Sequence, residues 1–332
     1  MIVLKDKYGR VHDYVRISLI DKCNLNCIYC NPVNRKRAFS KSDEHLSAES
    51  IIRLSKIFVT KLGIKKIRFT GGEPLLRKDF IEILRELKIF KNITPFKIGI
   101  TTNGTNLEKN IIKLKDNGVD YLNISLDTLK RIRFKEITGK DLYEETIDSI
   151  NKSIEYQFEK IKVNAVIMMG VNDDELTDFI DYFKDTDVNI RFIEYMPFGS
   201  NDWQVDGFIS CDEMIRRIKA KFELENINHE IKIAEDYSIA GHKGIVSFIS
   251  PISNHFCNTC NRLRITSTGD VKLCLFSRTN EPDLKEMLSD GKYTDEDIEN
   301  YFITILNAKE EKHSEVEELI QLNNNNMLSI GG

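Results

Sequence analysis

The chain alternates short β-branched runs with amphipathic stretches from Tyr14 to Met196, and this alternation limits its possible folds most. Strands are predicted for the ranges Tyr14–Ile20, Lys65–Thr70, Phe96–Thr102, Tyr121–Leu126, Ile161–Met168 and Ile190–Met196. Strands separated by helical stretches favour parallel βαβ units. Six units predict an α/β fold with a barrel, full or partial, and a doubly wound open sheet is the structural alternative.

Helix candidates occupy the stretches between these runs. The first has Ser47 as its expected N-cap, followed by one apolar face that contains Ile51, Leu54, Phe58 and Leu62. The others cover about Lys78–Ile89, Asn110–Asn117, Tyr143–Gln157 and Asp174–Phe183. Asn172–Glu175 is interpreted as a capping box for the last of them.

The pattern changes after about residue 200. A helix is expected in "CDEMIRRIKAKFE", short strands with a hairpin in "GIVSFISP" and "NRLRITSTGDVKLCLF", and helices over about Pro282–Leu288 and Asp295–Ala308. Gln321–Asn326 is polar, and the chain ends in Gly-Gly. The predicted parts are therefore residues 1–200, 201–322 and a tail, 323–332.

Composition excludes several function classes. The 332 residues are 41% hydrophobic and carry a formal net charge of −4, so no overall basic field attracts nucleic acid or an anionic membrane. No apolar run approaches the roughly 18 residues of a membrane span. We expect a cytoplasmic protein without nucleic-acid or membrane partners, and both a monomer and a homodimer remain open.

Six of the seven cysteines form two groups of three, and the first group is Cys23, Cys27 and Cys30, spaced C-x3-C-x2-C. Clustered cysteines in a long cytosolic chain are typical of metal or redox ligands. Three thiolates are one short of a structural zinc site. They suit a [4Fe–4S] cluster with one iron left open, and a zinc knuckle with a distant ligand is the alternative. The seventh cysteine, Cys211, is interpreted as structural.

The second group is Cys257, Cys260 and Cys274, spaced C-x2-C-x13-C. His255 could complete a zinc site of three cysteines and one histidine, or the group could hold a second [4Fe–4S] cluster with an open iron. If "RLRI" is a strand, Arg262 and Arg264 project to one face, and two planar guanidinium groups there suit a carboxylate or phosphate.

The unusual residues follow predicted strands. The first cysteine group, Gly71–Pro74, Thr102–Gly104, Ser125 with Asp127, and Met196-Pro197 follow strands one to four and six. Ligands in such folds bind at the carboxyl ends of the strands. These segments are therefore expected to meet at one mouth.

The C-x3-C-x2-C spacing, with aromatic Tyr29 between the last two cysteines, resembles the radical S-adenosylmethionine family, and "GGEP" fits the same resemblance. The resemblance implies that the open iron binds the amino and carboxylate groups of S-adenosylmethionine. It also implies that a 5′-deoxyadenosyl radical forms. The cofactor carries this chemistry, and the protein orients it and excludes water.

From Val15 to Gly332, "RISLIDKCNLNCIYCNP", "KIRFTGGEPLLRKD", "FIEYMPFG", "FCNTCNRLRIT" and the terminal Gly-Gly together resemble the GTP 3′,8-cyclases of molybdenum cofactor biosynthesis. This resemblance implies an α/β fold with an incomplete (β/α)6 TIM-like barrel (1–200), an auxiliary-cluster and GTP-binding segment (201–322) and a mobile tail (323–332). It implies hydrogen abstraction from C3′ of GTP and closure onto C8, giving (8S)-3′,8-cyclo-7,8-dihydroguanosine 5′-triphosphate. It further implies an external electron donor and product hand-off to a cyclic pyranopterin synthase.

The same resemblance implies roles for individual residues. Two [4Fe–4S] clusters would be held by Cys23, Cys27 and Cys30 and by Cys257, Cys260 and Cys274. S-adenosylmethionine would contact Tyr29, Gly72, Ser125 and Met196. GTP would be bound by Arg16, Arg68, Thr101, Lys162, Arg262 and Arg264, and the catalytic set would be Arg262, Arg264, Gly331 and Gly332.

Two other functions are considered. One is another radical S-adenosylmethionine enzyme with an auxiliary cluster, either peptide-modifying or a dehydrogenase. The second is a scaffold protein with two zinc knuckles. Iron and sulfide content separates the second from the enzymes, and dependence on GTP separates the two enzymes from each other.

Overall fold

All six strands predicted in the first part of the chain are present. The computed structural model describes residues 2–30, 39–198, 201, 203–228, 233–276, 284–289, 291–321 and 327–331. Its first six strands are β1 (Tyr14–Ser18), β2 (Lys66–Thr70), β3 (Lys97–Thr102), β4 (Tyr121–Ser125), β5 (Lys160–Ile167) and β6 (Asn189–Glu194). Each of them pairs in parallel with the next.

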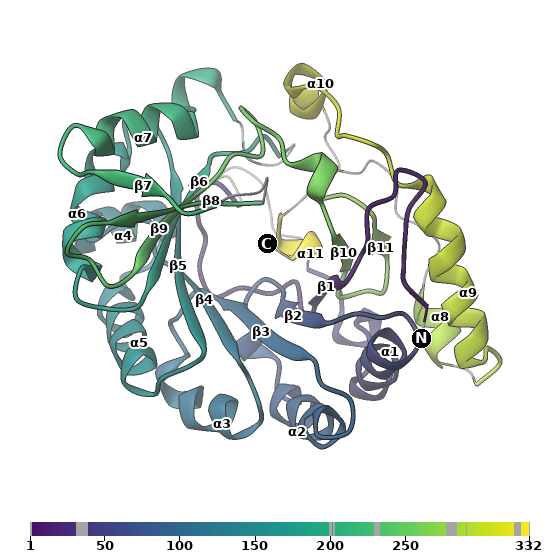
Figure 1. Cartoon of the computed structure of the whole chain (residues 1–332). Helices are drawn as coiled ribbons and strands as arrows, with labels where there is room; N and C mark the ends of the chain where they lie inside the picture. The colour runs from purple at the N-terminus through teal and green to yellow at the C-terminus, as the bar shows by residue number, and fades with distance from the viewer. Residues whose placement is uncertain are drawn as a thin grey trace.

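The strands form one curved, 11-stranded sheet in the order β11-β10-β1-β2-β3-β4-β5-β6-β9-β8-β7. Figure 1 shows the sheet curving around a central space with helices on its outer side. The sheet ends at β11 and β7 and does not close. The predicted α/β fold with an incomplete barrel is therefore confirmed.

The C-terminal region extends this sheet at both edges. At one edge β9 (Ile245–Ile249) runs parallel to β6, followed by antiparallel β8 (Glu235–Ile239) and β7 (Leu224–Asn226). At the other edge β10 (Arg262–Ile265) runs parallel to β1, and β11 (Val271–Lys272) completes a hairpin. The sequence predicted strands at β9, β10 and β11, but it predicted neither β7 and β8 nor that these strands join the barrel sheet.

Most helices lie where the apolar periodicity placed them. They are α1 (Ala48–Thr60), α2 (Phe80–Lys91), α3 (Ile111–Asp116), α5 (Tyr143–Glu155), α6 (Leu176–Phe183), α7 (Cys211–Lys219), α8 (Leu284–Ser289) and α9 (Asp295–Ile305). The expected cap of α1 is confirmed, because Ser47 Oγ accepts a hydrogen bond from the backbone N–H of Ser50 at 3.1 Å. Three short helices were not predicted: α4 (Arg131–Thr138), α10 (Val316–Gln321) and α11 (Met327–Ile330).

The predicted capping box at Asn172–Glu175 is wrong. The Asn172 side chain makes no cap hydrogen bond. Its amide nitrogen donates to the carbonyls of Asp127 at 2.7 Å and Val166 at 2.9 Å, and its oxygen accepts from Met168 N at 2.8 Å. Asn172 therefore links the end of β5 to the loop that follows β4, because a short amide side chain satisfies loop backbone groups as readily as a helix end.

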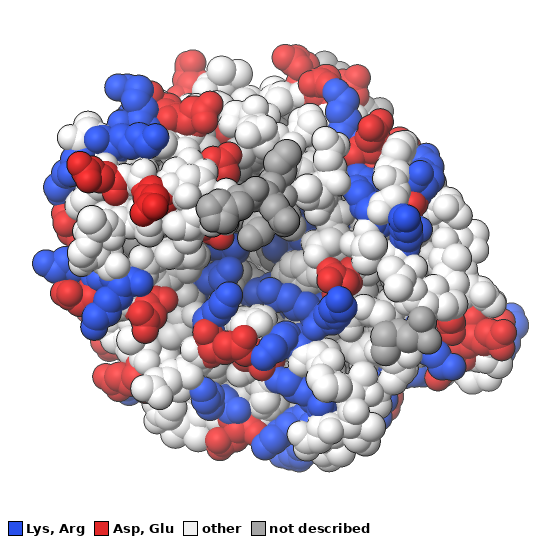
Figure 2. Space-filling view, viewed as in Figure 1, with Lys and Arg blue, Asp and Glu red and all other residues white. Residues whose placement is uncertain are grey.

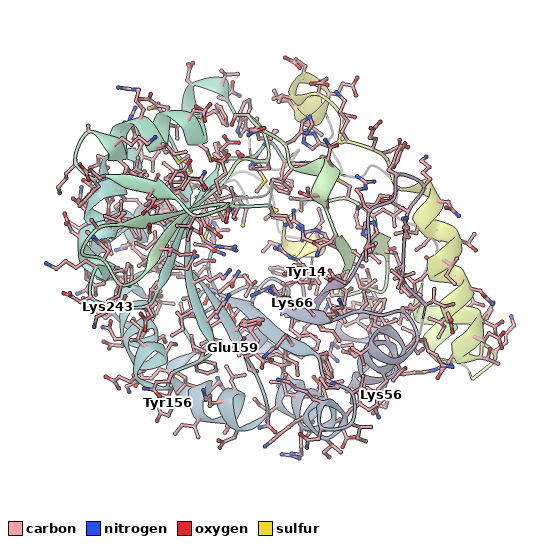
Figure 3. All side chains as sticks on the ribbon, in the orientation of Figure 1. Tyr14, Lys56, Lys66, Tyr156, Glu159 and Lys243 are labelled. Carbon is pink, nitrogen blue, oxygen red and sulfur yellow. The ribbon has the colours of Figure 1, made fainter. Side chains whose placement is uncertain are left out.

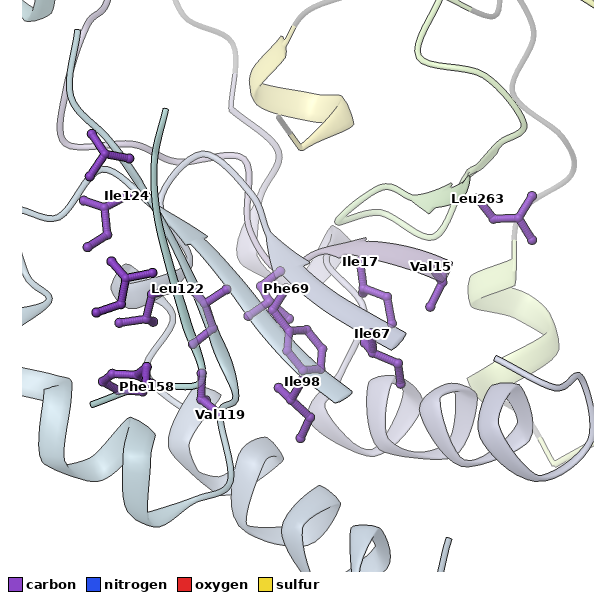
Figure 4. Packing of buried hydrophobic residues seen from close by; sticks show 14 of the residues in the cluster. Val15, Ile17, Ile67, Phe69, Ile98, Val119, Leu122, Ile124, Phe158 and Leu263 are labelled. Atoms are coloured by element: carbon purple, nitrogen blue, oxygen red, sulfur yellow. The ribbon is translucent and has the colours of Figure 1, made fainter. Parts of the chain in front are cut away.

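Residues that alternate along the strands divide between the two faces of the sheet. The outward side chains of β1 and β2 are apolar and fully buried, as with Val15, Ile17 and Ile67. Figure 4 shows these side chains together with Phe69, Ile98, Leu122 and Leu263 in the packed layer of the sheet. The inward positions between them carry polar residues such as Arg16 and Arg68. The hydrophobic core therefore lies outside the curve, and the interior is free for a polar site.

No helix in the described ranges is long and apolar enough to cross a membrane.

The C-terminal region is joined to the barrel by an aromatic contact that can be tested. Phe302 of α9 and Phe58 of α1 are both fully buried, with ring centroids 4.8 Å apart. Phe302→Ala is expected to lower the free energy of unfolding by about 3–5 kcal/mol, because it removes a large ring and leaves a cavity. Chemical denaturation of the cluster-loaded protein measures this change. Ile132→Ala, at a position that is 77% exposed in α4, is the control and should change stability by less than about 0.5 kcal/mol. Equal effects of the two variants would contradict this account of the contact.

Candidate active site

A cavity of about 1480 Å³, counting its open mouth, fills the inner side of the sheet. It is lined from the carboxyl ends of the barrel strands, from the first cysteine loop, from β10 and from α11. The residues of the predicted site that line it are Arg16, Cys23, Cys27, Tyr29, Cys30, Gly72, Thr101, Ser125, Met196, Arg262 and Arg264. The predicted convergence of strand ends is therefore observed.

The first cysteine group lies in the loop that follows β1, and all three side chains are partly exposed to this cavity. Cys23 Sγ accepts hydrogen bonds from the backbone N–H of Leu25 at 3.4 Å and from Asn103 Nδ2 at 3.6 Å. Burial, followed by the neighbouring Cys30, raises the pKa of the Cys27 thiol well above its usual range. Iron can replace the protons of thiols crowded in this way, so the group fits an iron–sulfur cluster.

The end of β2 lies directly against the first cysteine loop. A Cβ atom at Gly72 would stand 2.3 Å from the Lys22 carbonyl oxygen, so only glycine fits there. The next residue, Glu73, is fully buried and accepts hydrogen bonds from Thr102 Oγ1 at 2.8 Å and Asn103 N at 2.7 Å. Burial raises the pKa of Glu73 to about 7. These contacts hold the ends of β2 and β3 against the cysteine loop.

Tyr29 is fixed by a buried carboxyl group. Its hydroxyl donates to Asp127 at 2.8 Å, and Asp127 also accepts from Val166 N at 2.9 Å. Burial raises the pKa of Asp127 to about 6. The aromatic ring between the last two cysteines of the first group is thereby held at the cavity wall.

The second cysteine group lines an adjoining cavity of about 470 Å³. Arg262 and Arg264 line both cavities, so the two cysteine groups lie on either side of the same pair of guanidinium groups. Burial alone would raise the pKa of the Cys260 thiol, but Arg262 and Lys309 outweigh it and the pKa falls to about 7. A thiolate beside fixed cations suits metal coordination.

His255 lines this second cavity with its ring packed on that of His313, the centroids 5.4 Å apart. Within the described parts of the chain, no three His, Cys, Asp or Glu side chains are arranged to hold a single metal ion. Neither alternative zinc site is therefore seen. A four-iron cluster is larger than one ion and binds one thiolate per iron, so its ligands stand further apart.

Cations gather on the inner face of the sheet, and Figure 2 shows Lys and Arg side chains around the central hollow. Arg68 lies behind the cavity wall, 2% exposed. Burial, followed by the charge of Arg191, lowers the pKa of Lys162 to about 6, and burial lowers that of Lys66 to about 8. Cations that perturb one another in this way lack a sufficient counter-charge, and a polyanion would supply it.

Several buried polar atoms in the described part of the site have no hydrogen-bond partner. They are Thr70 Oγ1, Asn123 Oδ1, Asn164 Oδ1 and Arg191 Nε. All four residues line the main cavity. Buried polar atoms are ordinarily satisfied, so the hydrogen bonding of the cavity wall is incomplete at these four atoms.

The C-terminal tail enters the central space, where Figure 1 places α11 inside the curve of the sheet. The Gly331 carbonyl accepts a hydrogen bond from Arg264 Nη1 at 2.7 Å. A Cβ atom at Gly331 would stand 2.3 Å from Thr70 Oγ1, and its φ is +75°, a left-handed conformation that favours glycine. Gly332 and residues 322–326 lie outside the described residues.

Sequence reasoning missed several residues of this site, including Tyr14, Lys66, Asn164 and Arg191. Each lies at an inward position of a predicted strand. Each is either two residues away from another inward polar residue on that strand or paired with one on the neighbouring strand. Side chains two positions apart on a strand point to the same face of the sheet. Lys66 precedes Arg68 by two positions, so the sequence did carry a signal that Lys66 lies on the same face.

In a comparison with known proteins, two protein families match different parts of the chain. The family described as the Radical SAM superfamily matches residues 17–183, and the family described as Molybdenum Cofactor Synthesis C matches residues 188–315.

Curated relatives are similar over most of the chain. "GTP 3′,8-cyclase, mitochondrial" of Arabidopsis thaliana is 39% identical over 332 residues, which cover 99% of this chain and 84% of that protein. "GTP 3′,8-cyclase" of Listeria monocytogenes serotype 4b is 44% identical over 282 residues, 83% of each chain. "Molybdenum cofactor biosynthesis protein 1" of Dictyostelium discoideum is 42% identical over 99% of this chain. This chain spans about half of that relative, since the match covers 52% of its length.

Solved structures share the fold. SuiB of Streptococcus suis, bound to S-adenosylmethionine, superposes with a TM-score of 0.61 at 16% identity, covering 86% of this chain and 68% of SuiB. Native anSMEcpe with bound AdoMet gives a TM-score of 0.57 at 18% identity, covering 88% of this chain and 83% of its own. At these identities the likeness shows the fold alone.

The contact of Gly72 with the cysteine loop can be tested through metal content. Gly72→Ala should displace the loop that carries Cys23, Cys27 and Cys30, because the added methyl group overlaps the Lys22 carbonyl. After anaerobic reconstitution, wild type should contain roughly eight iron atoms per chain and the variant about four. Gly207→Ala is the matched control, since its Cβ atom would meet only the Tyr195 ring at 3.7 Å. Full iron content in Gly72→Ala would refute the close approach.

Proposed function

Because the chain belongs to the GTP 3′,8-cyclase family of the radical S-adenosylmethionine superfamily, we propose that it cyclises GTP to (8S)-3′,8-cyclo-7,8-dihydroguanosine 5′-triphosphate. This reaction is the first step of molybdenum cofactor biosynthesis. One observation of the structure supports the proposal most: two groups of three cysteines lie on either side of one pair of arginines in a cation-rich cavity.

The donor sets fit two [4Fe–4S] clusters. Cys23, Cys27 and Cys30 would hold the first, and Cys257, Cys260 and Cys274 the second. When bound, the first cluster and S-adenosylmethionine supply one-electron cleavage of the sulfonium and hydrogen abstraction from C3′ of the GTP ribose. The residues that would contact S-adenosylmethionine are Tyr29, Gly72, Ser125 and Met196, all on the wall of the same cavity.

The cations would bind and orient the triphosphate. Arg16, Arg68 and Lys162 come from three different strands of one sheet, with Arg16 on the cavity wall and Arg68 behind it, and together they would neutralise several phosphate charges. Arg262 and Arg264 lie between the two cavities and would hold GTP between the radical source and the second cluster. Thr101 adds a hydroxyl to the cavity wall. Such positioning is what brings the reacting atoms close together.

The tail would complete the site. Gly331 contacts Arg264, and Met327 and Leu328 of α11 line the cavity. These apolar side chains help to exclude water and stray hydrogen donors from a radical intermediate. Gly332, expected to act with Gly331, remains a proposal.

The wider setting is also proposed. The reaction needs an external electron donor, and its product would pass to a cyclic pyranopterin synthase. We also propose that the chain divides into parts at residues 200/201 and 322/323. The proposed location is the cytoplasm, and the proposed state is a monomer or a homodimer. The Arabidopsis relative is named as a mitochondrial protein.

GTP binding should be coupled to proton uptake. The free protein holds Lys162 with a pKa of about 6 and Lys66 with a pKa of about 8, and a bound polyanion raises both by stabilising the charged forms. Affinity for GTP is therefore expected to rise as the pH is lowered from about 8 towards about 6. Calorimetry in buffers of different ionisation enthalpy measures the protons taken up. Lys162→Met should lose part of this uptake, and identical uptake in both proteins would contradict the assignment.

The reaction itself is tested anaerobically with S-adenosylmethionine and a reductant. We expect GTP to increase the formation of 5′-deoxyadenosine and to yield the cyclised triphosphate. Cys274→Ser should retain iron in the first group but lose the response to GTP, because the second group faces the shared arginines. Formation of 5′-deoxyadenosine that is indifferent to GTP in the wild-type protein would refute the proposed function.

A further inference from the structure

Tyr14 is the first residue of β1 and lies among the cations of the site. In the sheet it pairs with Arg262 of β10 on one side and Lys66 of β2 on the other. Figure 3 shows Tyr14 and Lys66 next to each other on the inner side of the curved sheet. Tyr14 therefore stands where the barrel and the C-terminal hairpin bring their basic residues together.

The Tyr14 hydroxyl oxygen accepts hydrogen bonds from two of the arginines expected to bind GTP. Arg68 Nε donates to it at 2.8 Å and Arg16 Nε at 3.2 Å. The ring also faces cations, with Lys66 Nζ 5.0 Å and Arg16 Cζ 5.7 Å from its centroid. A phenol oxygen can accept two such bonds, and here both come from guanidinium groups.

The charges around Tyr14 act on the phenol itself. Burial alone would raise the pKa of Tyr14, but the nearby cations Arg16, Arg68, Lys66 and Arg262 bring it well below its usual range. The hydroxyl oxygen, which accepts a hydrogen bond from each of two guanidinium groups, thus lies in the middle of cations that otherwise repel one another. This interaction draws the guanidinium groups together before an anion arrives.

The two hydrogen bonds also set the direction of each guanidinium group. They use Nε, so the terminal nitrogens point elsewhere. In Arg68 one terminal nitrogen donates to the Ile100 carbonyl at 2.9 Å. Arg16 lines the main cavity. Arg16, held through Nε, keeps both terminal nitrogens for a preorganised fork that suits phosphate oxygens, whereas Arg68 has already committed one of its two terminal nitrogens.

We propose that Tyr14 is a positioning residue for substrate binding, whose hydroxyl oxygen holds Arg16 and Arg68 in the orientation that receives the triphosphate of GTP. This inference rests on the proposed function and deepens it. Tyr14 acts through the two arginines, and its effect depends on the phosphates of the substrate and not on the guanine base.

The test compares ligands with and without phosphates. Tyr14→Phe removes the hydroxyl oxygen and keeps the ring, and in the cluster-loaded protein it should weaken GTP binding about tenfold, as expected for lost hydrogen bonds to charged groups. Guanosine binding, measured by the same equilibrium dialysis, should not change. The matched control is Tyr121→Phe. Tyr121 also begins a strand and has Lys66 Nζ 4.6 Å from its ring centroid, but its hydroxyl donates to Glu159 at 3.0 Å, so GTP affinity should be retained.

A double-mutant cycle tests the coupling to Arg16. Lys has no Nε fork, so Tyr14→Phe should cost less affinity in an Arg16→Lys background than in wild type. Equal losses in both backgrounds would overturn the role assigned to Tyr14, as would equal losses for GTP and guanosine in Tyr14→Phe alone. Failure of the wild-type protein to bind GTP would instead refute the proposed function.

A second pair of variants covers the case in which Tyr14→Phe does not retain its clusters. Tyr14→Gln keeps an acceptor oxygen, whereas Tyr14→Leu has none. Tyr14→Gln should bind GTP more tightly than Tyr14→Leu, and equal affinity in these two proteins would overturn the inference.

Discussion

The parallel pairing of β1 with β10 is the constraint on which the site depends. Four residue pairs, from Tyr14 with Arg262 to Ile17 with Ile265, join the start of the barrel to a segment about 250 positions later in the chain. This register places Arg264 beside Arg16 on the inner face and buries Leu263 on the outer face. It also brings the loop of Cys257 and Cys260 to a cavity that adjoins the one lined by the first cysteine group. Without this pairing the two groups would open onto separate surfaces, and no substrate could lie between them.

The interior that results holds more positive charge than its own acidic groups balance. The protein has a formal net charge of −4, yet its inner face collects arginines and lysines whose pKa values are lowered by burial and by one another. Such an arrangement costs stability in the free protein and is offset by the apolar layer on the outside of the sheet. The missing counter-charge is what a triphosphate brings. A bound polyanion therefore relieves the repulsion between these cations. This relief favours a site that is selective for phosphorylated nucleosides.

Local patterns predicted the strands well and the long-range partners poorly. The β-branched runs identified β1 to β6, and the cysteine spacings identified the residues that line both cavities. By contrast, α4 was missed because "RIRFKEIT" is short and highly charged, with only a weak apolar face. Asn172 has the sequence position of a helix cap, although its amide links β5 to the loop that follows β4. That β9 and β10 would join the barrel, and that Arg191 and Tyr14 would share its interior, depends on strand pairing across the fold. One sequence taken by itself carries little signal for strand pairing between distant segments.

The central claim is that two four-iron clusters, each with one open iron, would lie in two adjoining cavities that share Arg262 and Arg264, where one cluster binds S-adenosylmethionine and the other binds GTP. Electron paramagnetic resonance of the reduced, reconstituted protein, titrated separately with each ligand, tests it most directly. The account predicts two distinct cluster signals, one perturbed by S-adenosylmethionine alone and the other by GTP alone. A single cluster signal, or two signals of which GTP perturbs neither, would contradict it.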